Sequence, residues 1–264
     1  MNKAEKQHIV KTEGLSIGYR SKKGSTVIAE HINISLFSGE LVGLIGANGI
    51  GKSTLLRTLT KVQPKLKGSI QINEKSLKQY TNLELAKVLS LVLTEPVVSK
   101  NLTVFELVAL GRQPYTNWIG NLSSKDLQIV EQAIVQINIQ DLKDKMCYEL
   151  SDGQLQKVMI ARALAQDTDL IILDEPTTHL DMYHKAYILK LLQQLARDTN
   201  KTILFSSHEI DLAIQLCDKL IVMTPNEVVS DTPCNLISSG TFENLFPKDL
   251  IAFDEETGSF RVKK

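Results

Sequence analysis

The segment GANGIGKST, residues 46–54, most restricts the fold that this chain can adopt. It follows the apolar run LVGLIG (41–46) directly and leads into STLLRTLTK (53–61), which has helical periodicity. The apolar run is nearly continuous rather than alternating, as in a strand that helices cover on both faces. The glycines allow successive backbone N–H groups to curl inward without clashes from Cβ atoms. The segment therefore predicts a buried strand, a glycine-rich turn and a helix in immediate succession.

This turn also has the chemistry of a phosphate site. Gly46, Gly51, Lys52 and Ser53 match G-x-x-x-x-G-K-[ST], and the helix N-terminus adds partial positive charge. Lys52 would reach the β- and γ-phosphates, and the Ser53 hydroxyl would ligate Mg²⁺. We therefore predict that the chain binds a nucleoside triphosphate with Mg²⁺. The candidate binding residues of the turn are Gly46, Ala47, Asn48, Gly49, Ile50, Gly51, Lys52, Ser53 and Thr54.

Three further apolar runs, 170–174, 202–207 and 220–224, predict parallel strands with helices between them, at 155–166, 183–197 and 209–217. Alternating patterns in the segments 9–19 and 26–40 predict an antiparallel sheet. The fold class expected is α/β, a P-loop NTPase three-layer core with an antiparallel β subdomain and an inserted helical subdomain.

The domain organisation expected is a single nucleotide-binding domain over residues 1–264. Residues 1–94 and 166–264 form its α/β core, and residues 95–165 form the helical subdomain. The last stretch, DLIAFDEETGSFRVKK, predicts a hairpin that turns at residues 256–258.

The composition excludes several classes of protein. The 264 residues carry 30 basic and 30 acidic side chains, so the chain lacks the net positive charge that is typical of nucleic-acid-binding proteins. We therefore expect no nucleic-acid partner. Three scattered cysteines suit neither a disulfide framework nor a clustered metal site. No apolar run reaches the roughly 18–20 residues of a membrane span, and the N-terminus has no signal-peptide core. We expect a cytoplasmic protein.

Acidic residues and a histidine follow two of the predicted strands. Asp174 ends the strand 170–174, so its carboxylate should lie at the sheet edge where ligands of such folds collect. It would hold Mg²⁺ through water, and Glu175 would act as general base toward an attacking water. His208 follows the strand 202–207 at the same edge, where it would contact the γ-phosphate.

The tetrad SDGQ, residues 151–154, has the character of a helix start with a Ser151 N-cap. Gly153 nevertheless lies in the first turn, where glycine costs roughly 1 kcal/mol against alanine. An ordinary capped surface helix would not explain that glycine.

With these residues assembled, the chain resembles the nucleotide-binding subunit of an ATP-binding cassette (ABC) transporter over nearly its whole length. Gly46–Thr54 resembles the Walker A loop, and Leu170–Glu175 resembles Walker B with its catalytic glutamate. Thr178–Asp181 resembles the D-loop, His208 the switch histidine, and Tyr19 the aromatic residue that stacks on adenine.

The resemblance also gives the tetrad a role, because LSDGQ lies where the family signature L-S-G-G-Q is expected. In the family, two chains pack head to tail, and the signature serves the ATP of the partner. Ser151, Gly153 and Gln154 would then bind the γ-phosphate of the ATP held by a second copy of this chain, where a side chain at position 153 would obstruct the approach.

Two positions depart from the family pattern. Asp152 replaces the usual first glycine of the signature and places negative charge near a triphosphate, which should weaken closure of the dimer. The glutamine of the family Q-loop should fall at Thr94 or Glu95. We favour Glu95, because its carboxylate could approach Mg²⁺ as an oxygen ligand.

The segment LTVFELVALGRQPYTNWIGNLS, residues 102–123, resembles importer ATPases for ferric siderophores, haem and cobalamin. The resemblance implies that residues 102–119 receive an integral membrane permease, which in turn works with a substrate-binding protein. Tyr115, Trp118 and Ile119 would then be exposed, although Trp118 could equally pack in the subdomain core. The implied location is the cytoplasmic face of the bacterial inner membrane. A non-transport cassette with soluble partners, of the iron–sulfur assembly type, remains the alternative.

Overall fold

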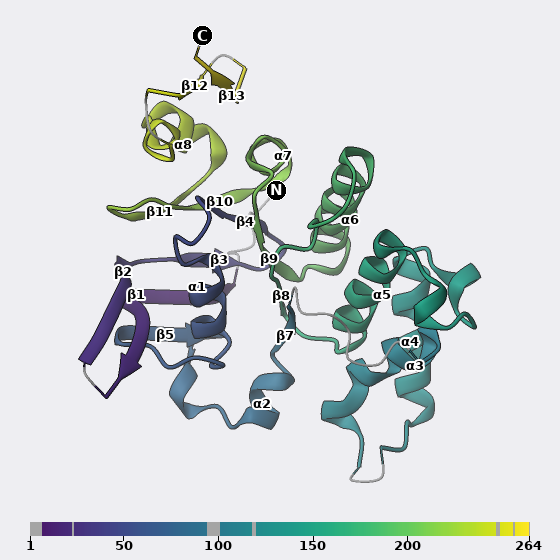
Figure 1. The fold of residues 1–264 in the computed structure, drawn as a ribbon. Coiled ribbons are helices and arrows are strands. Elements are labelled where there is room, and N and C mark those ends of the chain that lie inside the picture. The colour runs from purple at the N-terminus through teal and green to yellow at the C-terminus, as the bar shows by residue number, and fades with distance from the viewer. Residues whose placement is uncertain are drawn as a thin grey trace, which may run out of the picture.

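The centre of the molecule is a six-stranded sheet with the strand order β11-β10-β4-β9-β8-β7 (Figure 1). The computed structural model describes residues 7–22, 24–93, 101–117, 120–246, 249–255 and 257–263. The strands of this sheet are β4 (Leu41–Gly46), β7 (Leu89–Val92), β8 (Leu170–Leu173), β9 (Thr202–Ser207), β10 (Lys219–Met223) and β11 (Val228–Asp231). All neighbouring strands are parallel except β10 and β11. The four predicted core strands are confirmed, and β7 and β11 extend the sheet on either side.

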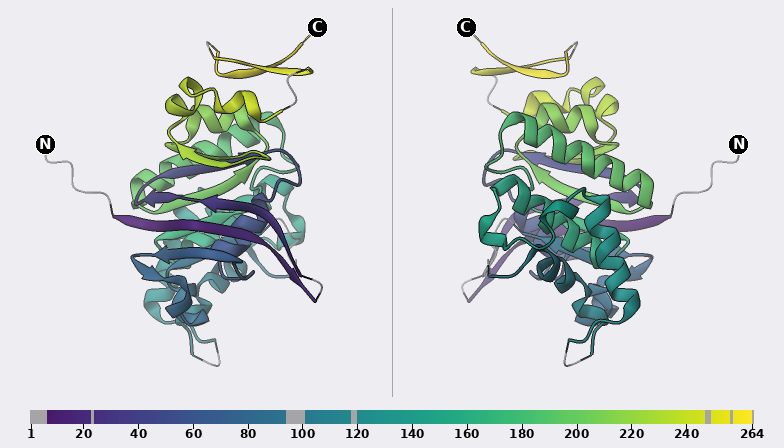
Figure 2. Two further views of the ribbon diagram at one scale, coloured as in Figure 1. Left: turned by 90° about the vertical axis from the view of Figure 1, so that its left-hand side faces the viewer. Right: turned by 90° about the vertical axis from the view of Figure 1, so that its right-hand side faces the viewer.

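The two faces of this sheet are covered differently, which gives three layers (Figure 2). In β4, Leu41 and Ile45 pack on the face that carries the long helices, whereas Val42 and Leu44 pack on the opposite face with Leu55 of α1. The helices that continue the core strands are α1 (Lys52–Leu59), α5 (Asp152–Ala165), α6 (Met182–Thr199) and α7 (Ile210–Leu216). The predicted helices at these four places are confirmed, and so is the three-layer α/β class.

The third layer contains the predicted antiparallel sheet. Its strands are β1 (His8–Ser21), β2 (Gly24–Ile32), β3 (Ser35–Phe37), β5 (Lys67–Ile72) and β6 (Lys75–Ser76). The long strand β1 organises it, because β1 pairs antiparallel with β2, β3 and β5. Short helices η1 (Leu77–Gln79) and α2 (Asn82–Ala86) lead from this sheet to β7.

A helical region lies between β7 and β8, at the right of Figure 1. Its elements are α3 (Val104–Ala109), η2 (Leu110–Tyr115), α4 (Ser124–Gln136), η3 (Gln140–Leu142), η4 (Cys147–Glu149) and α5. Buried residues of α3, α4 and α5 share one apolar cluster with the helical face of the central sheet. The subdomain boundaries at residues 94/95 and 165/166 stay a prediction, since residues 94–100 lie outside the described part of the chain.

The C-terminal part begins with α8 (Pro233–Ser238) and η5 (Thr241–Asn244). Strands β12 (Ile251–Asp254) and β13 (Ser259–Val262) then pair antiparallel, which confirms the predicted hairpin. None of the helices in the described ranges is long and apolar enough to span a membrane.

A buried ion pair fixes the helical region internally. Arg112, only 4% exposed, donates from Nε to Asp126 Oδ1 at 2.9 Å and from Nη1 to the Ala165 carbonyl at 2.9 Å. Asp126 also accepts hydrogen bonds from the hydroxyl and the backbone N–H of Ser123, which caps α4. The Ser123 hydroxyl in the first place, and then its N–H and Arg112, lower the pKa of Asp126. The pair therefore ties η2, α4 and the end of α5 together.

We expect Arg112→Met to lower the free energy of unfolding by about 3–5 kcal/mol, because it leaves the Asp126 carboxylate buried without its cation. The folded-state pKa of Asp126 is lowered, so the destabilisation should be complete at pH values above the ordinary aspartate pKa, where the carboxylate is charged in both states. The destabilisation should become smaller as the pH falls through the lowered pKa of Asp126. Urea unfolding at several pH values measures both effects. The exposed-site control Lys125→Met should change stability by no more than about 0.5 kcal/mol, and an equally small effect at Arg112 would contradict the assignment.

Candidate functional site

A cavity of about 460 Å³ opens at the carboxyl edge of the central sheet, where β4, β8 and β9 end. Ligands of open α/β folds bind at this edge. Its lining residues come from β1, the glycine-rich turn, α1 and the segments after β8 and β9, and they are Tyr19, Asn48, Gly49, Gly51, Lys52, Ser53, Thr54, Glu175 and His208. The structure thus brings together most of the residues that the sequence predicted to bind or act on a nucleotide.

The glycine-rich turn leaves the start of α1 open toward the cavity. Gly51, the N-cap of α1, has φ +114°, and a Cβ atom there would lie 2.5 Å from Ile28 Cγ2. Only glycine fits that conformation and that space. No side chain caps α1, so its first backbone N–H groups remain available to an anion. Gly46, Ala47 and Ile50 lie in the same turn but do not line the cavity.

Lys52 lies at the base of the cavity and is 5% exposed. Its Nζ donates to the carbonyl oxygens of Gly46 (2.9 Å) and Ala47 (3.2 Å) and lies 3.5 Å from His208 Nδ1. Burial lowers the pKa of Lys52, and the carboxylates of Glu175 and Asp174 partly offset this effect. A bound anion would stabilise the protonated ammonium further.

Asp174 joins the end of β8 to its neighbours on both sides. Its Oδ1 accepts hydrogen bonds from Ser53 Oγ at 3.2 Å and from Ser206 Oγ at 2.6 Å. Ser53 and Asp174 thus offer two adjacent oxygen ligands of the kind that Mg²⁺ prefers. Among the described residues, no cluster of three or more His, Cys, Asp and Glu side chains could hold a metal alone. A cation held by Ser53 and Asp174 would therefore need further oxygens from a bound anion or from water.

The Glu175 carboxylate is oriented through both of its oxygens. Oε1 lies 2.7 Å from His208 Nε2, and Oε2 accepts from Thr178 Oγ1 at 3.1 Å. The backbone N–H of Glu175 donates to Ser206 Oγ at 2.8 Å. Glu175 has φ +49°, an uncommon conformation for a residue with a side chain, and such strain is concentrated at functional sites.

Sequence analysis missed Ser206. It is fully buried in β9, where its hydroxyl accepts from Glu175 and donates to Asp174. The only signal was the paired serines that end the apolar run TILFSS.

Tyr19 lines the same cavity from strand β1. Its hydroxyl lies 3.0 Å from Thr54 Oγ1, whereas the residue as a whole is 53% exposed. An exposed aromatic ring beside a phosphate-type turn is suited to stacking on a planar ring.

Ser151, Gly153 and Gln154 do not belong to this cavity, and α5 lies apart from α1 (Figure 1). Ser151 caps α5 as predicted, with Gln154 N–H donating to Ser151 Oγ at 3.3 Å and Ser151 N–H donating to Gln154 Oε1 at 3.0 Å. A Cβ atom at Gly153 would meet only His184 Cδ2 at 3.5 Å and Leu180 Cδ2 at 3.7 Å, which are ordinary contacts. Packing within the chain therefore does not require glycine at position 153.

Several predicted positions lie outside the described residues, namely Thr94, Glu95, Trp118 and Ile119. Tyr115 is described and is 36% exposed, with its ring over the Arg112 guanidinium at 3.9 Å. Its predicted exposure is confirmed, and the roles of the other four stay predictions.

Comparisons with known proteins agree with this geometry. Residues 29–178 match the family described as ABC transporter. MJ0873 of Methanocaldococcus jannaschii, an uncharacterized ABC transporter ATP-binding protein, is 39% identical over 97% of this chain and 87% of its own length. YusV of Bacillus subtilis, a siderophore transport system ATP-binding protein, is 37% identical over 90% of this chain and 85% of its own length. An inward-facing structure of a metal-chelate type ABC transporter is similar with a TM-score of 0.78 and 27% identity, over 96% of this chain and 95% of that chain.

We expect Ser206→Ala to lower the free energy of unfolding by about 1–3 kcal/mol, because it leaves the Glu175 N–H and one Asp174 interaction without their buried partner. Thermal unfolding of the purified protein measures the change. Ser238→Ala removes an exposed hydroxyl and should stay within about 0.5 kcal/mol of the parent. Equal stability of Ser206→Ala and Ser238→Ala would show that the Ser206 bridge contributes nothing.

Proposed function

Because this chain belongs to the ABC transporter family, whose ATP-binding subunits hydrolyse ATP, we propose that it powers an importer of iron–siderophore, haem or cobalamin complexes. The observation that carries the ATPase part of the proposal is the cavity lined by Lys52, Ser53, Glu175 and His208, with Asp174 hydrogen-bonded to Ser53 beside it. The import part is supported by the relative named for siderophore transport. Such a set combines a phosphate-binding cation, oxygen ligands and a positioned carboxylate.

We assign the groups in the cavity as follows. Lys52 would exchange its carbonyl partners for oxygens of the β- and γ-phosphates, and the open start of α1 would bind the same phosphates. Ser53 and Asp174 would hold Mg²⁺, which neutralises phosphate charge when bound. Tyr19 would stack on adenine through its exposed ring. Glu95 stays a further candidate ligand for Mg²⁺.

Glu175 is the proposed general base. Its Oε1 lies 2.7 Å from His208 Nε2, so His208 orients the carboxylate. The other ring nitrogen, Nδ1, lies 3.5 Å from Lys52 Nζ, and a contact of His208 with the γ-phosphate would be made on this side of the ring. Glu175 would take a proton from the water that attacks the γ-phosphorus atom.

We propose a head-to-tail homodimer in which Ser151, Gly153 and Gln154 of one copy bind the ATP held by the other. Gly153 supports this arrangement, since no described residue of its own chain lies close enough to require the missing Cβ. A close approach of phosphate to the first turn of α5 would use it.

The proposed membrane partner is an integral permease that contacts residues 102–119, with a substrate-binding protein acting through that permease. This places the subunit on the cytoplasmic face of the bacterial inner membrane. The B. subtilis relative, named for siderophore transport, supports an iron chelate as cargo and favours the importer over a cassette with soluble partners.

We expect Glu175→Gln to bind ATP and to lower its hydrolysis by about 10²–10⁴-fold, because the amide keeps the shape of the carboxylate but cannot accept the proton. Light scattering with ATP should show a persistent dimer. Glu131→Gln, which removes a carboxylate remote from the cavity, should hydrolyse ATP normally. Near-normal hydrolysis by Glu175→Gln would remove Glu175 as the base.

The same variant, tagged and purified with ATP from solubilised native membranes, tests the importer assignment by mass spectrometry of its partners. A polytopic permease among them supports import and indicates the cargo. Recovery of soluble partners alone would favour the iron–sulfur type of cassette instead.

We expect Gly153→Ala to raise the stability of the monomer by about 0.5–1 kcal/mol, since alanine is the better helix former and has room there. ATP-driven dimerisation should nevertheless weaken, because the added methyl group lies between two copies. Thermal unfolding and light scattering measure the two effects separately.

Asp152→Gly is the matched companion variant. It should lower the stability of the monomer and strengthen ATP-driven dimerisation, opposite to Gly153→Ala. It removes an acid that favours the helix N-terminus, so the monomer loses stability. It also removes negative charge beside the partner's triphosphate, so the dimer tightens. Unchanged dimerisation in both variants would place the start of α5 outside the interface.

A further inference from the structure

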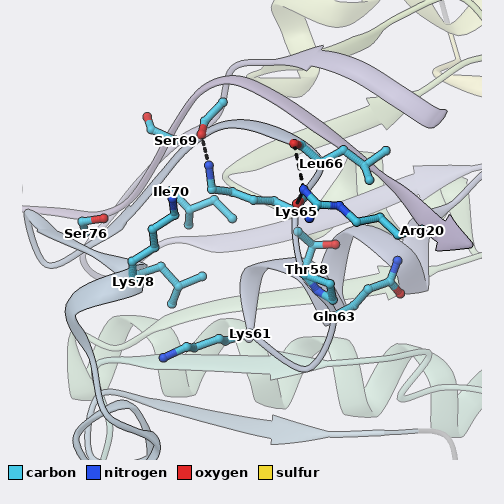
Figure 3. A pocket seen from close by; sticks show the side chains of 13 residues that line it. Arg20, Thr58, Lys61, Gln63, Lys65, Leu66, Ser69, Ile70, Ser76 and Lys78 are labelled. Carbon is cyan, nitrogen blue, oxygen red and sulfur yellow. Dashed lines mark hydrogen bonds between the residues drawn. The ribbon is translucent and has the colours of Figure 1, made fainter. Parts of the chain in front are cut away.

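A second cavity, of about 500 Å³, lies between the end of α1, the turn that follows it, and β5 with η1 (Figure 3). It is distinct from the nucleotide cavity, because α1 contributes Lys52–Thr54 to the one and Thr58 to the other. Its lining includes four cationic side chains and no carboxylate among the described residues: Arg20, Lys61, Lys65 and Lys78.

These cations have no carboxylate partner among the described residues. Arg20 Nη2 makes long contacts of 3.4 Å with the carbonyl oxygens of Lys65 and Leu66. Lys61 Nζ donates to the Tyr80 carbonyl at 2.6 Å, and Lys65 Nζ donates to the Gly68 carbonyl. For Lys78, no hydrogen bond or ion pair with another described residue is observed. Each of these cationic groups retains N–H donors for a ligand.

The cluster of like charges is unfavourable when the cavity holds no anion. Burial lowers the pKa of Lys65, and the positive charge of Lys78 lowers it further. An anion between these side chains would reduce the repulsion and raise the pKa of Lys65 again.

Hydrogen bonds of Gln63 and a close backbone contact at Gly68 hold one wall of the cavity in place. Gln63 N–H donates to the Arg57 carbonyl at 3.0 Å, and Gln63 Nε2 donates to the Gly18 carbonyl at 2.6 Å. Gly68 has φ +80°, and a Cβ atom there would lie 2.3 Å from Gly14 O, so only glycine permits this close contact between β5 and β1. The backbone wall of the site is therefore preformed, whereas the exposed side chains of Arg20, Lys61 and Lys78 would have to become ordered on binding.

We propose that this cavity binds a small anion that carries two phosphoryl groups. Each phosphoryl group has a charge of about −1.5 to −2, so two of them balance four cationic side chains. The cavity volume lies within the range of about 300–1,000 Å³ that is usual for small-molecule sites. Lysine and arginine side chains that line one cavity without carboxylates are suited to phosphate oxygens. This site goes beyond the proposed transport function and does not depend on it.

Calorimetric titration of the full-length protein with inorganic pyrophosphate tests the proposal, with a non-hydrolysable ATP analogue and Mg²⁺ filling the nucleotide cavity. We expect one pyrophosphate to bind per chain. Lys61→Gln/Lys65→Gln/Lys78→Gln should weaken this binding by about tenfold or more. Lys125→Gln/Lys145→Gln/Lys190→Gln removes three exposed charges elsewhere and should bind pyrophosphate normally.

Co-sedimentation with vesicles tests whether a lipid with paired phosphates binds instead of a soluble anion. Binding to phosphatidylcholine vesicles that contain cardiolipin, lost in the triple variant of the cavity, would identify a lipid headgroup whose two phosphodiester groups carry one negative charge each. Binding of pyrophosphate without vesicle binding would identify a soluble anion.

The proposal is overturned if neither pyrophosphate nor cardiolipin vesicles bind, or if the cavity variant binds as well as the control variant. Binding of the ATP analogue, measured in the same samples, reports separately on the proposed transport function.

Discussion

The carboxylate of Asp174 holds the functional edge of the molecule together. Its Oδ1 accepts from Ser53 at the start of α1 and from Ser206 in β9, so one oxygen connects three separate parts of the chain. Ser206 in turn accepts from the backbone of Glu175. These groups are linked to one another by hydrogen bonds. A shift of β8 or β9 would therefore also displace Ser53 and Glu175.

This arrangement depends on the layers that cover the sheet. Every residue of β4 and β9 is buried, so the strand ends are held rigidly by packing on both faces. Such rigidity makes it feasible to keep Lys52 almost fully buried at the same edge. The cost of burying that ammonium is offset by two carbonyl oxygens and by the nearby carboxylates of Glu175 and Asp174.

Sequence periodicity predicted the parts of the fold whose residues repeat a regular pattern. The buried runs of β4, β8, β9 and β10 were recognisable because each is nearly continuously apolar. β7 was missed, because Leu89–Val92 is short and includes Ser90, whose buried hydroxyl accepts a hydrogen bond from Thr168. β11 was missed because Val228–Asp231 is a half-buried edge strand with two polar residues. At the site, motifs predicted most of the residues that line the cavity, but the bridging role of Ser206 appears only when β8 and β9 lie side by side.

Gly51 and Gly153, which belong to the two predicted phosphate-binding segments, are explained in different ways. Gly51 is explained by its own chain, because its φ and the nearby Ile28 exclude any side chain. Gly153 has helical geometry and room for a methyl group, so alanine would stabilise the folded monomer more. Among the described residues, none therefore explains that glycine, and the N-terminus of α5 is exposed there with the hydroxyl of Ser151. The proposed head-to-tail dimer would account for it, because a second copy could then approach the first turn of α5 closely. In that arrangement Gly51 would be required by the fold of one chain and Gly153 by the assembly of two, with ATP in contact with both copies.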